Sequence, residues 1–198
     1  MANPLLDRAA PEQLARNRQA FEIVENLSTF EQLAAIVAAD LGTLGADNRP
    51  VSWRDTPVRV ALQFGWADAR EVLPQLTGTV QTRVPAVCQR CLQPCEIPLD
   101  LALALLLLGP DAVQTADVAL ESWELDEDTL RPLDVVEESL IMALPMVARH
   151  DSTSECGTLA TGAGEVPAPD TVRPFAGLKA RMKGTNDEPQ GGSEDWDA

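Results

Sequence analysis

The stretch IPLDLALALLL at residues 97–107 decides the fold, because every odd-numbered position in it is apolar. Side chains that alternate in this way belong to a β-strand with one buried face. Gly109 and Pro110 follow directly and end the strand. A second alternating stretch, VRVALQFGW at residues 58–66, predicts another half-buried strand. A β-sheet is therefore expected to form the centre of the fold.

Shorter signals extend the predicted sheet. A strand is expected at residues 76–84, after a turn at residues 70–74, and a weaker one at residues 118–125. Strands that follow one another through short turns pair antiparallel. The sequence thus predicts an antiparallel sheet of three to five strands.

Helical patterns precede these strands. A first helix is expected at residues 11–24, with Pro11 at its start. Ser28 and Glu31 have the spacing of a capping box, which predicts the start of a second helix, and Gly42 is expected to end it.

A third, acidic helix is predicted after the strands, at residues 133–145. Asp134 and Glu137 repeat the spacing of a capping box, and Pro145 ends the helix. Helices segregated from a run of consecutive strands are typical of an α+β protein. We therefore expect an α+β fold with N-terminal helices and one acidic C-terminal helix.

The charge of the chain is strongly negative and unevenly distributed. Its 198 residues include 31 Asp and Glu against 15 Lys and Arg, a net charge of −16, and residues 111–198 carry 13 of these net charges. Surfaces that bind nucleic acid gain affinity from Lys and Arg that neutralise phosphates. The excess of acidic over basic residues therefore argues against an ordinary phosphate-binding surface and favours a basic partner.

Composition also divides the chain and suggests its location. Residues 1–157 are expected to form a single α+β domain with a C-x-x-C turn. Residues 158–198 are expected to be a mostly disordered acidic tail with a short apolar segment at residues 174–182. The N-terminus has no apolar stretch typical of a secretory signal, and the longest apolar run, residues 101–108, is too short to span a membrane. The expected location is cytoplasmic.

Three of the four cysteines and the only histidine fall into two groups. Cys88 and Cys91 form a C-x-x-C pair between two predicted strands, and His150 and Cys156 lie far downstream. Together they supply four nitrogen and sulfur ligands, which suits a tetrahedral structural Zn²⁺.

Two other interpretations stay open on spacing alone. Cys88 and Cys91 can be small buried residues while His150 caps a helix end, or the C-x-x-C pair can be a redox centre. The alternating run that follows favours zinc, because a redox pair normally opens a helix. Cys95 is expected to be a solvent-facing thiol near the turn, and Arg90 a solvated side chain.

The acidic residues after Pro110 allow a different metal hypothesis. Asp117, residues 121–128, Glu137 and Glu138 could suggest a Mg²⁺ site of a nuclease. The sequence contains neither an acidic calcium-type loop nor a nucleotide-binding or hydrolase motif. A solvated or partner-facing acidic surface is therefore the better interpretation.

Several motifs, in this order, resemble the YceD family, whose members are called large ribosomal RNA subunit accumulation proteins. The resemblance extends over about residues 50–180. Its motifs are C-Q-R-C-L at residues 88–92, E-E-S-L-I-M-A-L-P at 137–145, R-H-D-S with a later Cys at 149–156, and P-F-A-G-L-K at 174–179.

The resemblance implies a bacterial cytosolic factor for synthesis, processing or accumulation of the 23S ribosomal RNA of the large subunit, with no enzymatic activity attached. It keeps Cys88, Cys91 and Cys156 as ligands and leaves His150 or Asp151 as the fourth. Since the net charge repels RNA, the expected partner is a basic large-subunit ribosomal protein or a pre-ribosomal particle. Direct contact with ribosomal RNA stays open, and neither DNA nor a membrane is expected. The alternatives are a Mg²⁺-dependent RNA-processing enzyme and a thiol redox or metal-sensing module.

Overall fold

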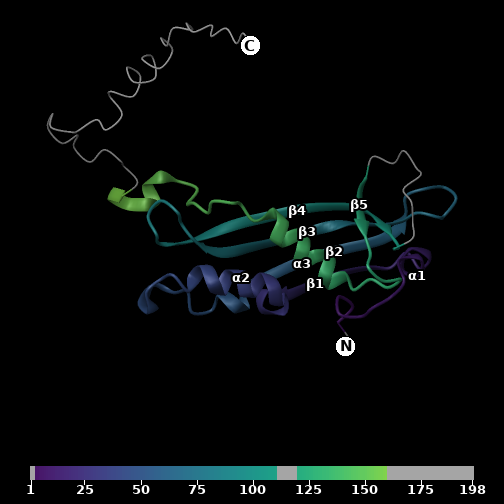
Figure 1. The fold of residues 1–198 in the computed structure, drawn as a ribbon, viewed down its shortest axis with the longest axis horizontal. Coiled ribbons are helices and arrows are strands. Elements are labelled where there is room, and N and C mark those ends of the chain that lie inside the picture. Colours follow the sequence, from purple (N-terminus) through teal and green to yellow (C-terminus); the bar gives the residue numbers. More distant parts are fainter. Residues whose placement is uncertain (1–2, 111–119, 160–198) are drawn as a thin grey trace, which may run out of the picture. The chain divides into compact units, whose positions relative to one another are not determined.

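The computed structural model of the chain describes residues 3–110 and 120–159, which contain three helices and one five-stranded sheet (Figure 1). This architecture confirms the predicted α+β class. The strands are β1 (Ala20–Asn26), β2 (Pro57–Trp66), β3 (Pro74–Val87), β4 (Pro94–Leu108) and β5 (Glu121–Glu124). The α-helices are α1 (Pro11–Arg16), α2 (Glu31–Leu41) and α3 (Pro132–Ala143), and short 3-10 helices are η1 (Leu27–Thr29), η2 (Ala46–Asn48), η3 (Trp53–Asp55) and η4 (Thr153–Leu159).

The strands lie in chain order across the sheet. β1 to β4 pair antiparallel, as predicted, but β5 pairs parallel to β4 over residues 105–108. The prediction of a wholly antiparallel sheet is therefore wrong for the last strand. A parallel pairing requires the chain to step back from Leu108 to the level of Leu105, and residues 109–120 connect the two strands.

One face of the sheet and two helices form the core. Alternate side chains of β2 are buried, and α2 packs against β3 while α3 packs against β4 and against α2. Figure 1 shows α3 lying across the sheet with α2 beside it. Burying large apolar side chains in this way is the main favourable term in folding. The largest of them include Phe30, Phe64, Leu33, Leu76 and Leu140.

The predicted first helix is too long. α1 ends at Arg16, and residues 20–24 belong to the edge strand β1. Arg18 has a positive φ of 46°, which breaks the helix. Phe21 and Ile23 then face the core side while their neighbours are exposed, so the strand period replaces the helical one.

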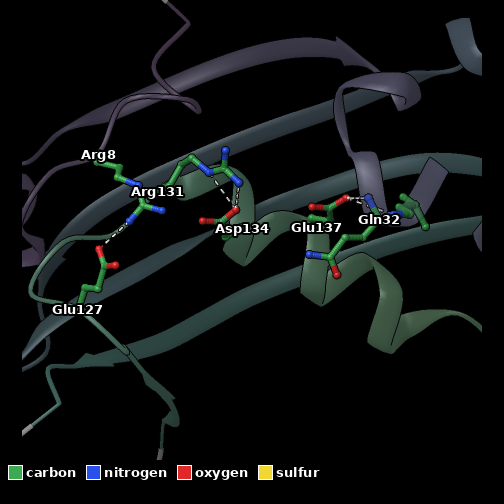
Figure 2. Close-up of polar contacts among 7 residues, drawn as sticks. Arg8, Gln32, Glu127, Arg131, Asp134 and Glu137 are labelled. Atoms are coloured by element: carbon green, nitrogen blue, oxygen red, sulfur yellow. Dashed lines mark hydrogen bonds and ion pairs between the residues drawn. The ribbon is translucent and has the colours of Figure 1, made fainter. Parts of the chain in front are cut away.

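Both predicted capping boxes are wrong. Ser28 lies in η1, and neither α2 nor α3 has a side-chain hydrogen bond from its own N-cap residue. Asp134 instead pairs with Arg131 at the start of α3 (Figure 2).

Glu137 of α3 caps α2 instead. Its side chain is 5% exposed, and its Oε1 accepts hydrogen bonds from the backbone N–H groups of Gln32 (2.6 Å) and Leu33 (3.1 Å), as Figure 2 shows. These N–H groups belong to the first turn of α2, where they have no partner within the helix and where the helix dipole favours a negative charge. Glu137 therefore both caps α2 and fixes α3 against it.

The N-terminal residues lie against the segment that leads into α3. Ala9 and Leu130 exchange two backbone hydrogen bonds, of 3.0 and 2.8 Å, and the N–H of Leu133 donates to the carbonyl of Leu5 (3.0 Å). Leu5 is fully buried. Leu5 and Ala9 are thus held in place by residues more than 100 positions later in the sequence.

Parts of the sequence-based interpretation lie outside the described residues. These are the tail from residue 160, with the apolar segment at residues 174–182, and the first two residues of the predicted strand 118–125. Among the described residues, no helix combines the length and the apolar character needed to cross a membrane.

Replacing Glu137 by Ala should destabilise the protein by about 2–3 kcal/mol, because two buried N–H groups of α2 then lose their acceptor. Glu138 is the matched control, since it is exposed on the same helix, and Glu138→Ala should cost about 0.5 kcal/mol or less. Urea unfolding of both variants measures the difference. Equal effects of the two substitutions would show that the cap contributes little.

Candidate metal centre

The connection between β3 and β4 is a tight turn that carries Cys88 and Cys91. The N–H of Cys88 donates to the carbonyl of Gln93 (2.9 Å), and the N–H of Leu92 donates to the carbonyl of Cys88 (2.8 Å). Leu92 has a positive φ of 56°, which is an unfavourable conformation for a leucine. The two hydrogen bonds hold the turn in this conformation. The turn therefore fixes the backbone from which both thiols project.

The segment after α3 is attached to this turn. The N–H of Gln89 donates to the carbonyl of Ala148 (2.9 Å), and the guanidinium Nη2 of Arg90 donates to the carbonyl of His150 (2.8 Å). These contacts bring the residues after α3 beside the C-x-x-C turn. Arg90 is half-buried, so the prediction of a solvated side chain is wrong.

The structure brings together all four residues that the spacing predicted as a zinc set. The ligand atoms of Cys88, Cys91, His150 and Cys156 lie within 4.8 Å of one another, which is close enough to hold a metal ion. The three thiols are buried and free of disulfides. The sulfurs of Cys88 and Cys156, 68 residues apart in sequence, lie 3.8 Å apart. Two sulfurs at about 2.3 Å from a tetrahedral zinc would be about 3.8 Å apart, so the donor set fits this metal.

His150 is the member of the pair His150 and Asp151 that joins the cluster. Its Nδ1 lies 3.2 Å from Oε2 of Glu155, and its Nε2 is buried without a hydrogen-bond partner among the described residues. A carboxylate on one ring nitrogen typically orients a histidine whose other nitrogen binds a metal. Asp151 is exposed and is not in the group.

The thiols are not electrostatically equivalent. Burial raises the pKa of Cys88, but backbone N–H groups of the turn and of His150 point at its sulfur and lower the pKa overall. Burial raises the pKa of Cys156, and the neighbouring sulfurs of Cys88 and Cys91 add to this effect. One thiolate is thus favoured, while further negative charge at the site is opposed unless a cation balances it.

Cys95 is not part of the cluster, and the prediction that its thiol faces solvent is wrong. It lies on β4 opposite Ala86 and is 7% exposed. It occupies the same odd-numbered face as Ile97 and Leu99, which explains its burial. Burial, followed by nearby negative groups of which Cys88 is the first, raises the pKa of Cys95 to about 11.

The acidic residues do not gather into a magnesium site. Glu137 caps α2, and Glu127 pairs with Arg8 at 2.8 Å. Within residues 3–110 and 120–159, the Cys and His cluster is the group of side chains that lies close enough to hold a metal. Asp117 lies outside these residues.

Two residues at the site were missed from the sequence. Glu155 could have been noticed, because it lies five residues after the only histidine. Asp40 gives no such signal: its Oδ2 accepts a hydrogen bond from the N–H of Val87 (2.7 Å), at the end of β3, from a helix far away in sequence.

Comparison with known proteins gives one family. The family model described as "Large ribosomal RNA subunit accumulation protein YceD" matches residues 76–180. This region includes β4, β5, α3 and the four residues of the cluster. No curated protein and no solved structure matches the chain.

Cys95 should resist iodoacetamide in the native protein at about pH 8, because a buried thiol with a pKa of about 11 is a thiolate about one part in a thousand of the time. In denaturant all four cysteines should react. Mass spectrometry of peptides gives the extent of labelling at each position. Labelling of Cys95 at the same rate in both conditions would place its thiol at the surface.

Proposed function

The chain belongs to the YceD family of large ribosomal RNA subunit accumulation proteins, and we propose that it is a cytoplasmic, non-enzymatic ribosome biogenesis factor. In this role it supports synthesis, processing or accumulation of the 23S ribosomal RNA. The family match over residues 76–180 is the observation that carries the proposal. The match includes the turn between β3 and β4, α3 and all four residues of the cluster.

The charge of the chain favours a protein as the direct partner. With a net charge of −16, the chain repels the ribosomal RNA backbone and attracts basic proteins. Many ribosomal proteins of the large subunit are basic because they bind RNA. We therefore propose contact with such a protein, alone or within a pre-ribosomal particle, and electrostatic steering would make this association sensitive to salt.

The cluster of Cys88, Cys91, His150 and Cys156 is proposed to hold one structural Zn²⁺. Four protein ligands complete a tetrahedral zinc, and no open position is left for a substrate or an activated water. A bound zinc would join the β3–β4 turn to the segment after α3, and closing so long a loop would stabilise the folded state. A structural role agrees with a factor that acts by binding.

One observation favours a second candidate, a thiol redox module. The sulfurs of Cys88 and Cys156 are adjacent at 3.8 Å, and the pKa of Cys88 is lowered, which promotes attack by its thiolate. Formation of a disulfide between them would need an external two-electron oxidant and would release two protons. The zinc experiment separates this candidate from the structural site.

Full-length protein purified from cells is expected to contain one zinc per chain. Cys88→Ser and Cys156→Ser should each lose the metal and destabilise the protein alike, by about 3 kcal/mol or more, because each removes a ligand of the same ion. Cys95→Ser is the matched control and should keep the zinc, since Cys95 is buried outside the cluster. Metal analysis by mass spectrometry and urea unfolding measure the two effects.

Two results would contradict the shared zinc site. In the first, only Cys88→Ser loses metal or stability, which would leave Cys156 outside the site. In the second, the purified protein lacks metal and forms a reversible Cys88–Cys156 disulfide with oxidant. That result would support the redox module.

A pull-down with the tagged full-length protein tests the proposed partner. After treatment of the extract with RNase, a basic large-subunit ribosomal protein should remain bound at about 0.1 M salt. It should be lost at about 0.5 M, where screening shortens the range of electrostatic attraction. Recovery of ribosomal RNA by the pure protein, with no ribosomal protein present, would contradict the proposal.

The same purified protein tests the enzymatic alternative. A nuclease that uses the acidic segment would cleave precursor ribosomal RNA in the presence of Mg²⁺, and Asp126→Asn with Asp128→Asn would abolish the cleavage. We expect no cleavage by either protein. Cleavage that depends on these two carboxylates would replace the proposed role with an enzymatic one.

A further inference from the structure

Within the part of the chain that the structure describes, the edge of β4 that faces away from β3 is only partly covered. β3 pairs with β4 over residues 94–106, whereas β5 pairs with it only over residues 105–108. Among the described residues, no hydrogen bond reaches the backbone of this outer edge before Leu105. An uncovered edge presents N–H and C=O groups in the geometry that another strand requires.

The even-numbered residues of β4 point their backbone groups toward this edge. On the β5 side, the N–H of Leu125 donates to the carbonyl of Leu108 (2.8 Å). Alternate residues of a strand point their N–H and C=O to the same side, and the register of β4 runs without a bulge. The backbone groups of Ala102 and Ala104 therefore face the uncovered edge, and the ladder with β3 does not use them.

A groove of about 810 Å³ lies along this edge and is called the β4 groove here. Residues 101–105 of β4, Trp123 of β5 and Met142 of α3 contribute to its lining. Leu101 and Trp123 are half-buried and Met142 is exposed, so the groove offers apolar surface next to the open backbone edge.

The rim of the β4 groove is acidic. Its two arginines, Arg8 and Arg131, already pair with the carboxylates of Glu127 and Asp134, as Figure 2 shows. The other four carboxylates of the rim have no salt bridge to any described residue. They belong to Glu121, Glu124, Asp126 and Glu138.

We propose that the β4 groove binds an extended, basic segment of a partner protein, which adds to β4 as a strand in line with β5. The backbone of Ala102 and Ala104 would supply hydrogen bonds, and the acidic rim would select lysine and arginine side chains. Apolar side chains on the alternate positions of the segment would contact Trp123 and Met142. An RNA backbone is excluded as the occupant, because its charge has the same sign as that of the rim. The inference rests on the proposed function, since it names the surface that takes the basic partner.

Strand addition can be tested directly with a defined probe. The probe is a synthetic peptide of about twelve alternating lysines and valines, and a peptide of alternating glutamates and valines is its control. Amide hydrogen exchange of the full-length protein, followed by NMR, should slow about tenfold or more at Ala102 and Ala104 with the basic peptide only. The N–H of Val24, which faces the outer edge of β1 at the other side of the sheet, should not change.

Proline substitutions test whether the outer edge of β4 binds the peptide, because they remove an outward N–H and leave the β3–β4 ladder intact. Ala102→Pro removes an outward N–H that the β3–β4 ladder does not use, and should weaken peptide binding about tenfold or more. Val24→Pro makes the same change on the outer edge of β1 and should leave binding within about twofold. Circular dichroism and thermal unfolding check that both variants fold.

A charge variant keeps the inference testable if Ala102→Pro does not fold. Glu124→Gln with Glu138→Gln should weaken binding of the basic peptide about tenfold and reduce its salt dependence. Glu22→Gln with Asp47→Asn removes two exposed carboxylates outside the groove and should change the affinity about twofold or less.

The results distinguish failure of the groove from failure of the proposed partner. Equal peptide affinity of wild-type protein and a folded Ala102→Pro variant, or of wild-type and the Glu124/Glu138 variant, would overturn the inference. If the wild-type protein and these variants then captured the same ribosomal protein equally well, the proposed function would still be supported. Peptide protection at Ala102 with no ribosomal protein captured would support the groove and refute that partner. A dimer in sedimentation that Ala102→Pro abolishes and Val24→Pro does not would assign the groove to a second copy of the chain and overturn the inference.

Discussion

The contact of Glu137 with the first turn of α2 is the constraint on which the arrangement of the helices depends. A carboxylate that is 5% exposed would be costly without hydrogen bonds, and two N–H groups at a helix start satisfy it. The contact joins residues 105 positions apart. It fixes α3 against α2, and the segment that follows α3 then lies beside the C-x-x-C turn.

Periodicity predicted the central strands well, because β2 and β4 each bury one face of alternating side chains. The ends of the strands were less predictable. Pro85, Pro94 and Pro98 lie within β3 and β4, although proline is usually read as a strand breaker. The prediction of a helix at β1 is wrong because the apolar alternation of Phe21 and Ile23 is short, and the pairing with β2 decides the conformation.

The four residues of the Cys and His cluster were predictable for a different reason. Cys and His are rare in this chain, so their spacing was informative before any contact was known. The residues that hold them are common types whose role depends on distant partners. Glu155 beside His150, Arg90 on the carbonyl of His150, and Asp40 on the end of β3 are examples. The burial of Cys95 follows from a strand that begins earlier than its sequence indicates.

The contacts of the N-terminal residues have a consequence for how the chain folds as it is synthesised. The backbones of Leu5 and Ala9 form hydrogen bonds with those of Leu133 and Leu130. The first turn of α2 likewise needs the side chain of Glu137 as its hydrogen-bond acceptor. Leu5 and Ala9 therefore lack these partners until α3 and the segment before it have been translated. Such long-range pairing gives slow, concerted folding rather than stepwise folding from the N-terminus. Until then the side chain of Leu5, which the folded protein buries completely, stays in contact with water.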